Sequence, residues 1–338
     1  MSNLDTCGIE VSAKERVVAR RQEERLEPLR SFANTAEGHQ ALIRYLRRAG
    51  RVVRVCLEST GLYGLDLALA LSAQEGLEVR VANPRAVRHF ATALMKRSKN
   101  DQIDAGVLEQ FAARLPFQPW QRPSVAAFTL QALARHLGEL VEMQAAEKNR
   151  QHAAELSQAI PAAIRRDLAR SLRAQARAIQ RLTKEARKLI AQEPELTERF
   201  ALLDSVPGIG ETSAVQILAE LAVLAPDLEA RQWVAGAGLD PREYRSGSSV
   251  QKKRRLSKAG NKHLRRALYM PALVASQHDP HLGGFYQRLL ARGKTKMQAL
   301  VAVMRKLLHA IFGIFKHLQP YDGAKLFPQP IPQEVITP

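Results

Sequence analysis

The stretch "RVVRVCLES" at residues 51–59 is the clearest strand signal in the chain, because β-branched residues alternate with arginine and a "TG" pair bounds the run. It closes on Glu58, at a position where the alternation would normally place a small polar residue. Further strand signals lie on either side of it, and together they predict a sheet. They are "DTCGIEVSA" (5–13), "ERVVARR" (15–21), a third candidate "EPLRSFA" (27–33), and "LEVRVAN" (77–83).

Helical patterns alternate with these strands. Asn34 is expected to cap one helix, with Glu37 in the capping-box position. Asn83 followed by proline begins another, and Asn100 can cap the helix "DQIDAGVLEQFAARL" (101–115). The predicted order is β-β-β-α-β-α-β-α-α, which indicates a mixed α/β domain over residues 1–115.

The rest of the chain is predicted to be mostly helical. The Pro-rich "PFQPWQRPS" (116–124) indicates a boundary. Residues 124–193 show apolar residues at three- and four-residue steps, broken by Pro161 into two long helices; an antiparallel pair and a coiled-coil dimerisation arm both fit. We expect a mostly α-helical domain over residues 194–325 and a disordered Pro-rich tail over 326–338.

Composition favours a polyanionic partner. The chain has 51 Lys plus Arg against 33 Asp plus Glu, a formal net charge of +18, which is typical of nucleic-acid-binding proteins. Two cysteines, Cys7 and Cys56, exclude a disulfide framework and a Cys-based zinc site. No signal peptide is recognisable, and charged residues interrupt the apolar run near residue 305, so we expect a cytoplasmic protein without a membrane span.

An acidic pair stands out against this basic background. In "SKNDQIDAG" (98–106), Asp101 and Asp104 are three residues apart and so lie on one helix face. Acids at a helix N-terminus are explained by the helix dipole alone. However, Glu10 lies on the first strand and Glu58 ends a central one. Acids on a first strand, a central strand and a late helix are what an RNase H-like fold uses to hold two divalent metal ions, and oxygen ligands suit Mg²⁺.

The C-terminal part carries two further motifs. In "VPGIGETSA" (206–214), Gly208 and Gly210 suit either a phosphate contact of a helix-hairpin-helix type or a simple turn between helices. The segment 242–266 holds ten basic residues and one acid, and phosphate contacts explain such density. These ten residues are Arg242, Arg245, Lys252, Lys253, Arg254, Arg255, Lys258, Lys262, Arg265 and Arg266. Within it, the hydroxyl-rich residues 246–249 taken alone favour a turn.

The chain resembles the insertion-sequence transposases of family one-ten, also called DEDD or Piv-like recombinases. The matching stretches are "GIEVSAKE", "CLESTGLYG", "VANPRAVRHFA", "KNDQIDAGVL", "VPGIGETSA", "GLDPREYRSGSS" and "RRLSKAGNKHLRRAL". The resemblance implies a RuvC-like, RNase H-like N-terminal domain whose acidic tetrad falls on Glu10, Glu58, Asp101 and Asp104 and holds Mg²⁺, two ions in all. The family usually has Asp where this chain has Glu10. Asp5 is a possible substitute, but its odd separation from Glu10 on a strand places it on the opposite face.

The resemblance also assigns the catalytic serine, for the family carries an essential serine just before a glycine in this motif, and Ser246 matches it. The implied function is a transposase that cuts and rejoins transposon and target DNA through a covalent serine intermediate. A transposon-encoded bridge RNA, a homodimer or homotetramer, and a place at the bacterial nucleoid in the cytoplasm are implied with it.

Two alternatives stay open: a RuvC-like Holliday-junction resolvase without covalent intermediate, which would not need Ser246, and a non-enzymatic basic nucleic-acid-binding protein, which would not need the acids.

Overall fold

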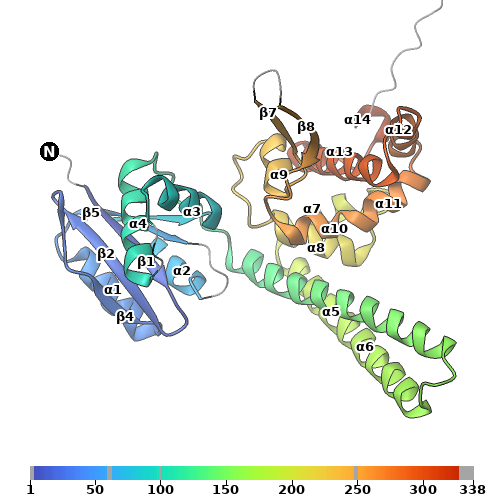
Figure 1. Cartoon of the computed structure of the whole chain (residues 1–338), viewed down its shortest axis with the longest axis horizontal. Coiled ribbons are helices and arrows are strands. Elements are labelled where there is room, and N and C mark those ends of the chain that lie inside the picture. The colour runs from blue at the N-terminus through green and yellow to red at the C-terminus, as the bar shows by residue number, and fades with distance from the viewer. Residues whose placement is uncertain (1–3, 59–62, 97, 99, 247–249, 327–338) are drawn as a thin grey trace, which may run out of the picture. The chain divides into compact units, whose positions relative to one another are not determined.

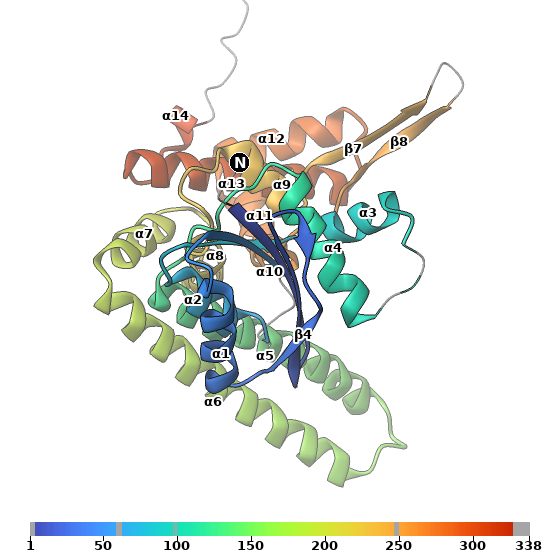
Figure 2. The same cartoon turned by 90° about the vertical axis from the view of Figure 1, so that its left-hand side faces the viewer.

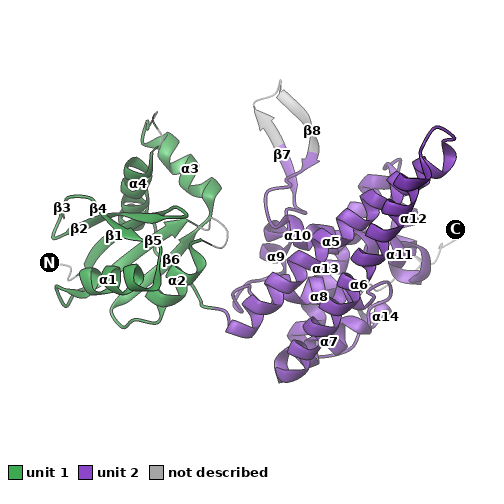
Figure 3. Ribbon diagram, turned by 90° about the horizontal axis from the view of Figure 1, so that it is seen from below, with its two compact units in different colours: residues 1–122 green, residues 123–338 purple. Residues whose placement is uncertain are grey.

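The chain divides into two compact units, residues 1–122 and 123–338, coloured green and purple in Figure 3. The computed structural model describes residues 4–58, 63–96, 98, 100–246 and 250–326, and only the backbone of residues 244–246, 250–254 and 326. The division falls inside the Pro-rich stretch that the sequence marked as a boundary. Each unit is described by itself below.

Unit 1 is built on a six-stranded mixed sheet in the order β3-β2-β1-β5-β6, with β4 also paired to β2. The strand β1 is central: it pairs antiparallel with β2 and parallel with β5, and β5 pairs parallel with β6. The strands are β1 (Leu4–Val11), β2 (Glu15–Gln22), β3 (Arg25–Leu26), β4 (Arg30–Ala33), β5 (Val52–Glu58) and β6 (Leu77–Ala82).

Helices cover both faces of this sheet. Figure 2 shows α1 and α2 on one side and α3 and α4 on the other. The two-residue period of β1 decides which residues face which layer: Cys7 and Ile9 pack with the apolar residues of α1 and α2, whereas Gly8 lies against α4. The helices are α1 (Ala36–Arg47), α2 (Leu65–Ser72), α3 (Pro84–Ala93) and α4 (Asp101–Arg114). This arrangement agrees with the expected RNase H-like fold.

The predicted helix starts are right in two cases and wrong in one. Asn83 and Asn100 cap α3 and α4, their side chains accepting the backbone N–H of Arg85 and Ile103. The expected cap of α1 at Asn34 is wrong by one residue: Thr35 is the cap, and the Asn34 side chain instead donates to the Ser12 carbonyl at 3.0 Å. The Asn34 amide, which the local sequence pattern had assigned to the helix cap, is therefore used in a contact with the turn between β1 and β2.

Unit 2 begins with two long helices, α5 (Val125–Leu156) and α6 (Ala162–Gln192), with Pro161 at the start of the second. They lie side by side and antiparallel (Figure 1), and the coiled-coil dimerisation arm stays a prediction. The remaining elements are α7 (Pro194–Asp204), α8 (Glu211–Leu221), α9 (Ala230–Gly236), β7 (Pro241–Ser246), β8 (Val250–Leu256), α10 (Lys262–Ala267), α11 (Tyr269–His278), α12 (Pro280–Ala291), α13 (Lys296–His317) and α14 (Gly323–Leu326).

The helix α13 lies in the hydrophobic core of this unit. In the described part of the chain it is the one helix long and apolar enough to cross a membrane, even with its interrupting charges. However, 56% of its most apolar window is buried inside the unit, where residues such as Val303, Leu307 and Ile311 are fully covered. Packing within unit 2 therefore accounts for its composition.

Candidate active site

The strand register places Glu10 beside Glu58. Ile9 of β1 pairs with Leu57 of β5 in the parallel ladder, so the next residue on each strand is an acid, and both acids lie at the carboxyl ends of their strands. Laterally paired residues project to the same face of a sheet. Gly8, two residues before Glu10, lies against α4, so both glutamates are on the face that α4 covers.

The helix α4 runs antiparallel to β1 and so brings its own acids to the same end. Thr6 of β1 contacts Glu109 of α4, and Gly8, further along the strand, lies against the earlier residue Ala105. Asp101 lies four residues before Ala105, roughly 6 Å toward the N-terminus of the helix. Glu10 lies two residues after Gly8, roughly 6.6 Å toward the C-terminus of the strand. Because the two elements are antiparallel, both lie on the same side of the Gly8–Ala105 contact. The first turn of α4, with Asp101 and Asp104, therefore overlies the strand ends that carry the glutamates.

A buried carboxylate holds α4 in this position. Glu109 is 1% exposed; it accepts a hydrogen bond from the Thr6 hydroxyl at 2.6 Å and pairs with Arg21 of β2 at 2.8 Å. The Arg21 contact is partly solvated, but the Thr6 contact is not. Glu109 was not among the residues predicted from the sequence, although a lone acid inside the apolar run "AGVLEQFAA" was the available signal.

A cavity of about 670 Å³ opens between α3, α4 and the end of β5. Glu58 and Asp104 line it, together with three basic side chains, Arg85, Arg88 and Lys96. Two acids with cations around them suit a phosphate group held next to a metal-binding carboxylate pair. Arg85 and Arg88 lie one turn apart on α3, and neither was predicted as a site residue.

The donor set fits a hard divalent cation, since it consists of carboxylate oxygens alone. Oε2 of Glu10 is enclosed from solvent, whereas Asp101 is exposed. Within the described ranges, no three acidic, histidine or cysteine side chains converge closely enough to hold an ion as they stand. The cysteine nearby is inert: burial raises the pKa of the Cys56 thiol to about 12, so it is protonated at neutral pH.

Asp5 does not belong to this set, as its position in the strand period predicted. It is 1% exposed on the opposite face of β1, where it pairs with Arg20 and Arg51, each at 2.9 Å. A doubly paired buried carboxylate of this kind is structural.

The predicted serine lies on a basic hairpin that projects from the helices of unit 2 (Figure 1). Ser246 ends β7 and its backbone pairs with Val250 of β8; its side chain, like the three residues after it, lies outside the described part. Arg242 and Arg255 face each other across the two strands, and both are exposed. The side chains of Arg245, Lys252, Lys253 and Arg254 also lie outside the described part.

The other residues predicted to contact nucleic acid differ in whether their side chains already bond to the rest of the protein. Lys262 is exposed. Arg265 donates to the Ala237 carbonyl at 2.8 Å, and Arg266 forms an ion pair with Glu142 of α5. Both arginines therefore help to pack α10, and their contact with nucleic acid stays a prediction.

The two predicted glycines play different parts. Gly208 has a φ of +89°, and a Cβ there would lie 2.6 Å from the Pro271 carbonyl oxygen of α11. In this chain its close backbone approach is to a neighbouring helix. Gly210 caps α8, and a Cβ added there would meet nothing within 4 Å. A phosphate contact at either glycine stays a prediction.

A buried ion pair ties the start of α10 to two other helices. Glu220 of α8 is 2% exposed and accepts from Arg135 of α5 at 2.7 and 3.0 Å and from Asn261 at 2.6 Å. Burial alone would raise the pKa of Glu220, but the hydrogen bonds from Arg135 and Asn261 outweigh it and lower that pKa. This network was not predicted from the sequence; the available signal was an acid in the middle of the apolar "VQILAELAV".

Comparison with known proteins relates most of the chain to transposases. Residues 7–161 match a DEDD transposase family, and residues 200–287 match the family described as Transposase IS116/IS110/IS902. A pilin gene-inverting protein of Moraxella bovis is 29% identical over 297 residues, which cover 86% of this chain and 90% of that protein; its counterpart in Moraxella lacunata gives the same values. An uncharacterized 43.6 kDa protein of insertion element IS110 from Streptomyces coelicolor is 31% identical over 140 residues, 40% of this chain and 34% of that protein.

Proposed function

Because this chain belongs to the IS110 family of transposases, we propose that it is a DNA recombinase that cuts transposon and target DNA and rejoins the ends. The pilin gene-inverting relatives, named for a DNA inversion, support an enzyme that rejoins what it cuts. The observation that carries the proposal is that α4 packs antiparallel on β1. The first turn of α4, with Asp101 and Asp104, therefore overlies the strand ends that carry Glu10 and Glu58.

In this proposal Glu10, Glu58, Asp101 and Asp104 hold Mg²⁺, with two ions in the active state. A bound divalent ion would offset the repulsion among the carboxylates and stabilise charge that develops on phosphate oxygens. Arg85 and Arg88, which line the cavity with Glu58 and Asp104, would bind the phosphodiester and hold it in place.

Ser246 is the proposed nucleophile. Its hydroxyl loses a proton and attacks a DNA phosphorus. A serine–phosphate bond forms, the bond from phosphorus to the oxygen of one strand end breaks, and that oxygen takes up a proton and leaves as an alcohol. The bond energy is thereby kept for rejoining. The basic residues of the hairpin and of α10 would contact phosphates along the strand. A helix-hairpin-helix motif at residues 206–214 would add backbone N–H donors to the same task.

We also propose that a bridge RNA supplies sequence choice by base pairing, so that the protein needs chiefly backbone contacts. The broad positive charge of +18 supports this division of labour. The active form would be a homodimer or homotetramer joined through α5 and α6, at work on the nucleoid in the cytoplasm.

The test is trapping of the covalent intermediate. Purified full-length protein, with RNA that copurifies with it, is incubated with nicked DNA and Mg²⁺ and run on a denaturing gel. Wild type should give a slower protein–DNA band, Ser246→Ala none, and Ser248→Ala a normal band as the matched control. Asp101→Ala and Asp104→Ala should abolish cutting but leave binding intact.

The opposite outcomes are as informative. Cutting by wild type without any adduct would replace the serine mechanism with attack by water, as in a resolvase. Full cutting by both aspartate variants would exclude the metal site.

A further inference from the structure

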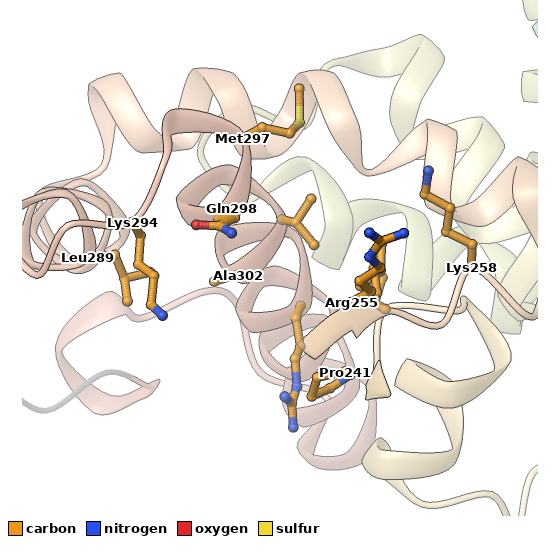
Figure 4. Close-up of a pocket in the computed structure, with 12 residues that line it drawn as sticks. Pro241, Arg255, Lys258, Leu289, Lys294, Met297, Gln298 and Ala302 are labelled. Atoms are coloured by element: carbon orange, nitrogen blue, oxygen red, sulfur yellow. The ribbon is translucent and has the colours of Figure 1, made fainter. Parts of the chain in front are cut away.

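A second cavity lies in unit 2, at the base of the hairpin and far in sequence from the acids. Its volume is about 400 Å³, within the range of sites that hold a small organic group. Its walls come from β8, from the turn after α12, and from α13 (Figure 4). Leu256, Leu289 and Val301 are among the apolar side chains that line it.

Basic side chains surround this apolar surface. Arg255, Lys258, Lys294 and Arg305 all line the cavity, and no acidic residue does. Figure 4 shows Lys258 and Lys294 entering from opposite sides. Across the residues that the structure describes, none of the four is held in an ion pair with an acidic side chain, so their charge is available to a ligand.

A cavity lined by both apolar and basic side chains suits only some classes of ligand. A simple phosphate would be satisfied by the cations and would gain nothing from the leucines, whereas an apolar ligand would not require four cations. A nucleotide needs both, because its base buries an apolar ring face while its phosphates require cationic partners. A base can enter such a cavity only after it has left the stack of its strand.

We propose that this cavity holds one unstacked nucleotide of the nucleic acid on which the protein acts, DNA or RNA, with its base against the apolar wall and its phosphates on the surrounding cations. The inference rests on the proposed function for the presence of nucleic acid. It adds a base-binding site to a region for which only phosphate contacts were expected, and it brings in Lys294 and Arg305, which lie outside the basic segment 242–266.

Gln298 adds a polar group at the same place. Its side-chain oxygen accepts from the Thr295 backbone at 3.1 Å, which fixes the amide, and its Nε2 group is left to donate to an acceptor on the edge of a base. Ala302 lies in the lining one turn further along α13. A larger side chain there would fill the space for a base without removing any charge.

The experiment compares oligonucleotides with and without bases. Octamers of thymidine, the same octamers with abasic residues throughout, and the corresponding ribonucleotide pair are titrated against full-length protein. In wild type the loss of the bases should weaken binding about tenfold, as expected for one stacked base. In Ala302→Phe that factor should fall close to one, because base-bearing strands lose the cavity while abasic strands do not. The DNA and RNA arms tell which strand supplies the nucleotide.

A charge pair provides an independent test that does not disturb the helix core. Lys294→Gln with Arg305→Gln should lower the slope of log affinity against log salt by about 1.4, roughly 0.7 for each phosphate contact. The matched control, Arg292→Gln with Lys296→Gln, removes the same charge from the same segment but outside the lining, and should change the slope by much less.

An equal base effect in wild type and in a folded Ala302→Phe protein, or equal slopes for the two charge pairs, would overturn the inference while nucleic-acid binding itself stands. Absence of any binding by wild type would instead count against the proposed function.

Discussion

Gly8→Ala should separate the helix acids from the strand acids. A Cβ at Gly8 would lie 2.1 Å from the Glu109 nitrogen, 2.2 Å from the Ala105 oxygen and 2.7 Å from the Leu108 carbonyl carbon, all of them backbone atoms of α4. Ordinary contact begins at 3.4 Å, so the nearest separation must grow by 3.4 − 2.1 = 1.3 Å. No side chain can turn away to make this room, and α4 itself must move.

The cost follows from that displacement. Overpacking of this kind destabilises a domain by about 1–3 kcal/mol. A misplacement of about 1 Å between catalytic groups lowers the rate on the order of a hundredfold. We therefore expect unit 1 of Gly8→Ala to remain folded but less stable, and DNA cutting to fall far more than the stability loss alone would explain.

The assay separates the two effects. In a Trp233→Phe background, the remaining tryptophan, Trp120, reports on unit 1, where its backbone N–H donates to the Val79 carbonyl at 2.7 Å. Urea unfolding followed by its fluorescence gives the free energy of unfolding of that unit. The same experiment with added Mn²⁺ should raise the unfolding midpoint of wild type through metal binding, and should raise that of Gly8→Ala much less.

Gly106→Ala is the matched control. It lies on the same helix, two residues after Asp104, and a Cβ there meets nothing within 4 Å. Helix propensity alone should stabilise it by up to about 1 kcal/mol, with cutting unchanged. If Gly8→Ala and Gly106→Ala unfold alike, respond alike to Mn²⁺ and cut alike, then the contact of α4 with β1 does not position the site.

Three other predictions concern single features. Glu10→Asp should retain or raise cutting because it restores the family's residue, whereas Glu10→Gln should lose it; an active Gln variant would show that residue 10 is not a metal ligand. Reversal of the four charges at residues 252–255 should weaken binding to all sequences alike and flatten the dependence of affinity on salt, and an unchanged slope would place the phosphate contacts elsewhere. Glu220→Gln should lower the free energy of unfolding of unit 2 by about 2 kcal/mol at pH 7, less than for a fully buried pair because Arg135 is partly solvated. Since the folded pKa of Glu220 is lowered, the stability it contributes is present above its unfolded pKa, near 4.3, and is lost as the pH falls through the folded value. Urea unfolding of wild type and variant should therefore converge in acid, and a difference that stays constant down to pH 3 would contradict this account.

Sequence patterns located most of the strands and named the four acids of the candidate site because those signals are local. Alternation identified the strand that ends at Glu58, and its two-residue period correctly set Asp5 apart from Glu10. The register could not be read in the same way. That Glu10 stands beside Glu58 depends on the pairing of β1 with β5, which local sequence does not encode.

The two buried acids that were missed share one cause: each acts through contacts distant in sequence. Glu109 contacts Thr6, 103 residues earlier in the chain, and Glu220 contacts Arg135, 85 residues earlier. Lone acids inside apolar runs were visible, but only the fold shows their partners. The cap of α1 failed for the same reason, since Asn34 is engaged by Ser12.

The side-chain amide of Asn261 makes unit 2 sensitive to the identity of a single atom. Its oxygen accepts from the backbone of His263 and Leu264 at the start of α10, while its nitrogen donates to Glu220 at 2.6 Å. Asn261→Asp would keep the oxygen that caps the helix but replace the N–H donor with a second carboxylate facing the buried one of Glu220, and like charges so close repel strongly. The exchange of one nitrogen atom for an oxygen, with almost no change in shape, would thus weaken the contact through which the basic segment 242–266 joins the helical core.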